Sequence, residues 1–264
     1  MLTENLKEII TDCWNDFNDS KSNESSSILV NPSIPILWFG DLAKYRDSRK
    51  RIITVGLNPS NLEFSTKQNC NHEISLRFNK AMSCNNLTAD SEINNYYEAM
   101  NDYFKQNPYK KWFNSFEKVL NQLQSSYYED EIDFANRAIH LDIYAPIATN
   151  PTWGKLAVDK KKCLSCFKAY FSHLIKELKP EIVLISANVG IIKEVFGVVK
   201  CNAEYKSKRI DGKRAFIDAY DSCSIDGVVL ISGLNMSGTP FGGMKKEFIE
   251  TNMLAIKEKM NIQI

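Results

Sequence analysis

Three polar side chains follow or lie within segments that have the composition of buried strands, and their types suit hydrolytic chemistry. Asn58 follows a strand-like run in RIITVGLNPS, Asp142 lies in AIHLDIYAPIA, and Asn235 follows GVVLISG. A neutral amide at a strand end can orient a water molecule, and a second amide can donate a hydrogen bond to charge that develops as a bond breaks. A carboxylate accepts hydrogen bonds from a substrate. The alternative for Asn58 is that it only caps its own loop.

Strand-like and helical segments alternate along the chain, which predicts a parallel sheet with helices on both faces. The expected strands are 51–55, 138–144, 181–187 and 227–233, and the expected helices include 160–178 and 244–259. Functional residues of such folds collect at the carboxyl ends of the strands, so the polar segments there are the expected walls of one pocket. Asp211 and Gly212 predict a hairpin between 203–209 and 213–220.

The first 27 residues are predicted to be an appendage. An amphipathic helix over 3–17 is followed there by the Ser/Asn-rich link NDSKSNESSS. Residues 28–264 are expected to form one domain, with a long polar loop at 61–88 and a helical insertion at 90–124 that breaks at Pro108.

Composition is that of an ordinary globular protein, with 44% hydrophobic and 25% charged residues among 264. There is no run of about 18 apolar residues, so a membrane span is not expected. The N-terminal MLTENLKEII lacks the basic start and apolar core of a signal peptide, so the cytoplasm is the expected compartment.

Charge is unevenly distributed although the formal net charge is only +1. Residues 1–43 hold two Lys and seven acidic residues, a net of −5, so the remainder carries +6. Basic clusters recur at 44–51, 160–162, 206–209 and 245–246. Such clusters bind a phosphate backbone if the fold gathers them on one face; the alternative is solvated surface.

Seven cysteines without a secretory signal are expected to be reduced thiols. Cys163 and Cys166 have the spacing of a metal-binding pair, and Cys70, His72 and Cys84 lie upstream. Apolar residues at helical spacing around the pair favour core packing instead, so no metal is expected. His72 and His173 are isolated in the sequence, and His140 at a strand start is expected to be structural.

Glycine-containing loops follow the first and last strands, but neither matches a phosphate loop or a dinucleotide-binding fingerprint. Taken in order, the three polar segments resemble the uracil-DNA glycosylase superfamily. VGLNPS (55–60) is similar to the water-activating motif, and GLNMSG (233–238) is similar to the closing motif, with Met236 in place of the usual Pro. LDIYAPIA (141–148) resembles the base-reading stretch, but its Asn is missing and Asp142 stands beside that point. The resemblance covers about 36–80 and 138–259.

The resemblance implies a three-layer α/β/α sandwich around a four-stranded parallel sheet. It implies a monofunctional DNA glycosylase that flips a modified or mismatched pyrimidine out of DNA and leaves an abasic site. It also implies a monomer that needs no cofactor and no metal. The alternatives are a uracil repair glycosylase of the same fold, a non-catalytic nucleic-acid-binding protein, and a hydrolase of free nucleosides or nucleotides.

The resemblance also assigns roles to residues. Asn58 would position the water and Asn235 would donate to the departing base, while Ser237 would contact a flanking phosphate. Phe241 would be the apolar wedge that fills the vacated stack; its alternative is core packing. The expected substrate-binding set is Gly56, Leu57, Pro59, Ser60, Phe64, Phe78, Asp142, Tyr144, Ser237, Gly238, Thr239 and Phe241.

Three of these assignments concern the base. Phe64 or Phe78 would stack on it, and the resemblance does not choose between them. Asp142 would accept from the exocyclic amine of a cytosine derivative, whereas the carbonyl of uracil would be repelled. By analogy with phage-defence glycosylases of this superfamily, the substrate would be a modified cytosine in viral DNA. The alternative is a structural Asp142, with Tyr144 or a backbone amide reading the base.

Overall fold

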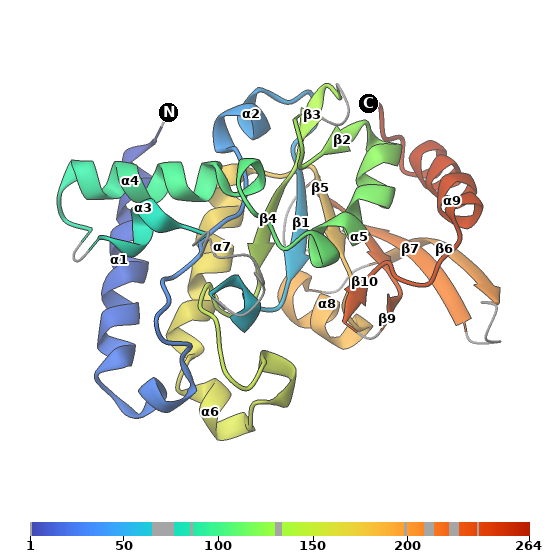
Figure 1. Cartoon of the computed structure of the whole chain (residues 1–264). Helices are drawn as coiled ribbons and strands as arrows, with labels where there is room; N and C mark the ends of the chain where they lie inside the picture. The colour runs from blue at the N-terminus through green and yellow to red at the C-terminus, as the bar shows by residue number, and fades with distance from the viewer. Residues whose placement is uncertain are drawn as a thin grey trace, which may run out of the picture. The chain divides into compact units, whose positions relative to one another are not determined.

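The computed structural model describes residues 2–64, 77–84, 87–129, 134–197, 200–208, 214–221, 227–236 and 238–264. The protein is α/β (Figure 1). Its chain divides into two compact units. Unit 1 contains Met1–Ala43, Leu57–Tyr109 and His140–Lys179, and unit 2 contains Lys44–Gly56, Lys110–Ile139 and Pro180–Ile264. The chain passes between the units several times, so neither unit is one continuous segment.

Unit 2 is built on a mixed sheet with the strand order β1-β5-β8-β7-β6. The strands are β1 (Ile52–Gly56), β5 (Ile182–Ile185), β8 (Val229–Gly233), β7 (Arg214–Asp221) and β6 (Lys200–Lys208). β1, β5 and β8 are parallel, and β7 is antiparallel to both of its neighbours. The predicted hairpin is therefore confirmed, and it extends the parallel strands into a mixed sheet that differs from the expected all-parallel one. Asp211 and Gly212 lie outside the described residues.

The parallel strands are buried because both of their faces are apolar. Every residue of β1 and β5 is buried, including Thr54, whose hydroxyl hydrogen-bonds the Tyr127 hydroxyl. Near-continuous apolar runs of this kind are typical of parallel strands that are covered on both sides. The amino end of the sheet is tied by Glu181, which accepts from the Arg51 amide at 3.1 Å and from Lys50 at 3.0 Å.

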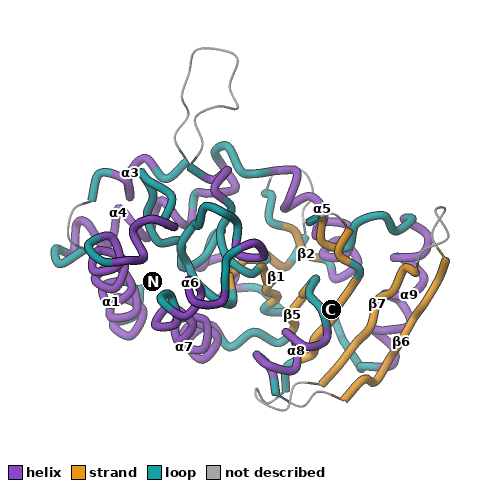
Figure 2. Tube along the Cα trace, turned by 90° about the horizontal axis from the view of Figure 1, so that it is seen from below, coloured by secondary structure: helices purple, strands orange, loops and turns teal. Residues whose placement is uncertain are grey.

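The helices of unit 2 are α5 (Lys110–Leu120), α8 (Val189–Phe196) and α9 (Lys246–Lys259). Figures 1 and 2 both show α9 running beside β6 and β7. The apolar stripes of the helices face this core: α5 buries Phe113 and Phe116, and α9 buries Ile249 and Met253. The short strands of the unit are β2 (Ser125–Ser126), β3 (Asn136–Arg137), β9 (Asn235–Met236) and β10 (Thr239–Pro240).

Unit 1 contains three long helices, α1 (Glu4–Lys21), α4 (Asp90–Asn101) and α7 (Lys168–Leu178). Thr3 caps α1 by accepting from the Leu6 amide at 3.2 Å. Trp14 and Phe17 on this helix are buried, and Asp16 accepts from the Tyr170 hydroxyl of α7 at 2.7 Å. The expected appendage is therefore an integral part of unit 1, because its apolar face is covered by the rest of the unit.

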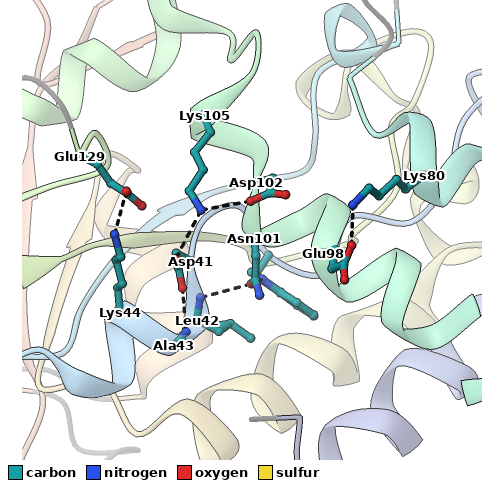
Figure 3. Close-up of polar contacts among 11 residues, drawn as sticks. Asp41, Leu42, Ala43, Lys44, Lys80, Glu98, Asn101, Asp102, Lys105 and Glu129 are labelled. Carbon is teal, nitrogen blue, oxygen red and sulfur yellow. Dashed lines mark hydrogen bonds and ion pairs between the residues drawn. The ribbon is translucent and has the colours of Figure 1, made fainter. Parts of the chain in front are cut away.

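Polar contacts join the end of α4 to the first residue of α2 (Leu42–Asp47) and to the segment before it (Figure 3). The Asn101 side-chain oxygen accepts from the Leu42 amide at 3.2 Å and from the Trp38 indole at 3.1 Å. Lys105 lies 3.1 Å from Asp102 and 3.8 Å from Asp41 (Figure 3). These contacts fix the path of the chain ahead of β1.

The shorter elements of unit 1 refine the expected boundaries. They include α3 (Asn79–Met82), α6 (Val158–Lys162) and β4 (Ile139–Asp142), whose first residue belongs to unit 2. The helix expected over 160–178 is divided between α6 and α7, and the helical insertion is divided between α4 and α5, with the break around Pro108. Among the helices of the described residues, none combines the length and the hydropathy needed to cross a bilayer.

Candidate functional site

Asn58 is held by the segment that follows β4. Its side-chain nitrogen donates to the Ile147 carbonyl at 3.1 Å and to the Thr149 hydroxyl at 3.2 Å. The Tyr144 amide donates to the Leu57 carbonyl at 3.0 Å, so two neighbouring residues of the motif are attached to the same segment. Because a carbonyl can only accept, these bonds fix the direction of the amide. The residue is half-buried, and its side-chain oxygen then remains as a hydrogen-bond acceptor.

Asp142 ends β4 and is buried, with 7% of its surface exposed. One carboxylate oxygen lies 3.7 Å from the His140 Nε2, and the other has no hydrogen-bond partner among the described residues. Burial raises the pKa of Asp142, and His140 opposes that shift. A buried acceptor without a donor is uncommon in folded proteins, so this oxygen is the strongest indication of a ligand contact in unit 1.

Glu63 is a second buried carboxyl group, and it is not among the residues predicted from the sequence. It accepts from the Tyr103 hydroxyl at 2.7 Å and lies 3.1 Å from Arg77 Nη1. The pKa of Glu63 is raised from 4.5 to about 7, mainly by burial; Arg77 and the hydrogen bond from Tyr103 oppose the shift, and the nearby charge of Asp142 adds to it. The sequence signal was an acid between two apolar residues in NLEF, directly after the Asn-Pro turn.

Aromatic rings surround these two carboxyl groups. Phe78 is 2% exposed, and its ring is stacked on Tyr103 with centroids 5.4 Å apart. Phe64 is half-buried, and its ring centroid lies 5.9 Å from that of Phe78. Phe39 lies between Tyr103 and His140, at 4.8 and 5.5 Å. Phe78 is therefore a core residue, which leaves Phe64 as the better placed of the two expected stacking residues.

Unit 1 thus brings together several of the residues expected from the sequence. Asn58 and Asp142 are connected through the 142–149 segment, and Pro59 and Ser60 continue the Asn58 turn. Ser60 caps the short helix Asn61–Glu63 by accepting from the Leu62 amide at 3.1 Å, and so orients the residue that carries the second carboxyl group. The remaining expected residues of this unit are Leu57, Phe64, Phe78 and Tyr144.

Asn235 belongs to unit 2, where Gly56 also lies at the end of β1. The Asn235 side chain is exposed, and its nitrogen donates to the Ser186 carbonyl at 3.2 Å. The Ser186 hydroxyl donates in turn to the Gly233 carbonyl at 3.1 Å. This small network fixes Asn235 at the carboxyl end of β8, where the sequence predicted it.

The segment after Asn235 forms a small antiparallel ladder in which Met236 pairs with Thr239. Gly238 in its turn has a φ of +76°, a conformation that suits glycine. Thr239 is half-buried, and Ser237 lies outside the described residues.

Phe241 is a core side chain with 1% of its surface exposed. Its ring packs on Phe116 with centroids 5.7 Å apart, and a Cβ added at Gly233 would lie 2.3 Å from the ring. Phe241 is therefore a residue of the core in this structure, and it is not an exposed wedge, because its ring fills the space that a side chain at Gly233 would occupy.

The described cysteines do not form a metal site. Phe167 and Leu174 of the predicted apolar stripe are buried, as expected for core residues. Cys163 and Cys166 on the same stripe are exposed, so the prediction of core packing is wrong for the two cysteines. Among described residues, no three His, Cys, Asp or Glu side chains are grouped as metal ligands. Cys70 and His72 lie outside the described residues.

Comparisons with known proteins do not identify a family. A scan against protein-family models, a search of curated proteins and a search of solved structures each return no match.

Proposed function

We propose that the protein is a monofunctional DNA glycosylase that hydrolyses the N-glycosidic bond of an extruded pyrimidine. The observation that carries the proposal is the anchoring of Asn58, whose nitrogen is committed to Ile147 and Thr149. Its remaining oxygen can accept one hydrogen of a water molecule and direct that water's lone pair away from the amide. Water of this kind needs orientation more than deprotonation, because the reacting sugar carbon is strongly electrophilic in the transition state.

In this reaction the water oxygen forms a bond to the sugar C1′ as the glycosidic bond breaks. The electron pair of that bond leaves with the base, and the water's surplus proton passes to solvent or to the departing base. No residue serves as a covalent nucleophile, so an abasic site is the product. The donor role of Asn235 toward the departing base is part of the same proposal, as are a monomeric state and a cytoplasmic location. We also propose a three-layer sandwich around four parallel strands, to which the antiparallel pair β6 and β7 is added.

Asp142 supports a cytosine derivative as the base. Its free oxygen is a buried acceptor that an exocyclic amine would satisfy, and an ionised carboxylate would repel a uracil carbonyl. This preference requires Asp142 to be ionised. Burial raises the pKa of Asp142, and the protonated carboxyl group would donate to a carbonyl instead. A modified cytosine of phage DNA is the substrate that we expect, with uracil as the alternative.

The experiment that tests the proposal measures base release. Oligonucleotides that contain uracil, mismatched thymine or modified cytosines are incubated with the protein, and alkali then cleaves the strand at any abasic site. We expect the strongest cleavage with a cytosine derivative. Cleavage of uracil above all others would remove the inference from Asp142, and no cleavage of any substrate would favour a binding protein without turnover.

Two variants connect that activity to the site. Asn58→Ala should reduce the rate about 100-fold or more, since loss of an oriented water is comparable to loss of a catalytic proton acceptor. Asn95 lies exposed on α4 in the same unit, so Asn95→Ala is a matched control that should retain full activity. Equal activity of the two variants would show that Asn58 does not position the water.

A further inference from the structure

Tyr144 and Trp153 form a stacked aromatic pair that carries two lysine ammonium groups. Their ring centroids are 5.1 Å apart and their planes differ by 12°. Lys168 Nζ lies 5.9 Å from the centroid of Tyr144, and Lys161 Nζ lies 6.0 Å from that of Trp153. These distances are at the outer limit of a cation–π contact, so two positive charges lie beside one stacked aromatic pair.

The same segment has a strong excess of positive charge. Residues 155–168 contain five lysines and a single acid, Asp159. Lys155, Lys162 and Lys168 are exposed, and Lys160 and Lys161 are half-buried. A basic run is often only solvated surface, but two of these ammonium groups lie against a stacked aromatic pair.

This basic segment is continuous with the segment that anchors Asn58. Tyr144 donates its amide to the Leu57 carbonyl, and Ile147 and Thr149 accept from the Asn58 side chain. A polymer bound along 144–168 would therefore run directly to the residue that we propose as the positioner of water.

We propose that this surface binds the phosphate backbone of a single DNA strand beside Asn58. We call it the lysine ledge, and its members are Tyr144, Trp153, Lys155, Lys160, Lys161, Lys162 and Lys168. The inference rests on the proposed function, because it takes DNA as the substrate. A regularly charged strand fits this surface, since each lysine that neutralises a phosphate releases condensed counterions whatever the base sequence.

The test is the binding of a fluorescent 20-nucleotide oligo-dT strand, followed by anisotropy between 50 and 200 mM salt. The ledge variant replaces Lys160, Lys161 and Lys162 by Gln. Its matched control replaces Lys111, Lys118 and Lys176 by Gln, which removes the same charge from exposed positions on α5 and α7. Urea unfolding of both variants confirms that each remains folded.

We expect the plot of log affinity against log salt for the ledge variant to lose about 2 from its slope, because each phosphate contact on a single strand contributes about 0.7. At 150 mM salt its binding should weaken on the order of 30-fold, while the control stays within about 3-fold of wild type. Equal weakening of the two variants would overturn the ledge, as would a wild-type protein that does not bind the strand.

Two further outcomes separate this inference from the proposed function. If the strand binds through the ledge but no base is released from any substrate, the ledge stands and the glycosylase proposal fails. If bases are released and the ledge variant binds and reacts like wild type, the glycosylase proposal stands and the ledge fails. Loss of binding to phosphatidylserine vesicles with DNA binding unchanged would also overturn it, in favour of a membrane surface.

Discussion

The buried carboxyl group of Glu63 should make the stability of the fold depend on pH in a definite direction. Glu63 is 5% exposed and accepts from Tyr103 and lies beside Arg77. Burial is the main cause that raises its pKa from an ordinary 4.5 to about 7. In the unfolded chain this group titrates near its ordinary value, so the two states hold different numbers of protons between these two pH values.

The sign and the size follow from that difference. Below pH 4.5 the group is protonated in both states, and its contribution to stability is fully present. As pH rises from 4.5 through 7, the unfolded chain has released its proton and the folded protein still holds it, so the free energy of unfolding falls. At about 1.4 kcal/mol for each pKa unit, the loss should reach about 3 kcal/mol by pH 8.

Urea unfolding at intervals from pH 5 to 8 measures this, with Glu63→Gln as the test variant. Gln can still accept from Tyr103 but does not titrate, so wild type should lose about 2–3 kcal/mol relative to the variant across that range. The control is Glu181→Gln. Burial raises the pKa of Glu181, but the Arg51 amide and Lys50 outweigh that effect and lower the pKa overall. The contribution of Glu181 to stability is therefore lost only in acid, as pH falls through that lowered pKa. The Glu181→Gln variant should keep the wild-type dependence between pH 5 and 8. A wild-type curve parallel to that of Glu63→Gln would refute the reasoning.

Two other substitutions test the site and the core. Asp142→Asn replaces the buried acceptor with a side chain that can also donate a hydrogen bond. The ratio of the release rate for uracil to that for a cytosine derivative should therefore rise at least 10-fold in single-turnover assays, on the order expected from a hydrogen bond that reads the base. An unchanged ratio would exclude base reading by Asp142. Phe241→Ala empties the space beside Gly233 and should lower the free energy of unfolding in urea by about 3–5 kcal/mol. Phe241→Leu should lower it by a smaller amount. Near-wild-type stability together with lost DNA binding would instead support the wedge role of Phe241.

Much of the fold could be predicted because its signals are local. The strands β1, β5 and β8 are short apolar runs bounded by turn residues, and Asp211 with Gly212 marks the hairpin of β6 and β7. The integration of α1 was not predictable in the same way. Its amphipathic face looks the same whether it covers a core or docks elsewhere, and only the burial of Trp14 decides the matter.

The residues of the candidate site also differ in whether the sequence alone indicates them. Asn58 and Asp142 could be selected from the sequence as candidates because of their order in the chain, since a polar residue at one strand end alone is common in turns. Glu63 could not, since a single acid in a polar stretch reads as surface until Arg77 and Tyr103 enclose it. The sequence left Phe241 with two interpretations, and the absence of a side chain at Gly233 is what makes room for its ring.

The most direct test of the account is single-turnover release of the best base from DNA by wild type and by Asn58→Ala. We expect alkali-labile strand breaks with wild type and a rate reduced about 100-fold or more with the variant, at unchanged affinity for the strand. Base release at the same rate by both proteins would contradict the central claim that the Asn58 oxygen orients the attacking water.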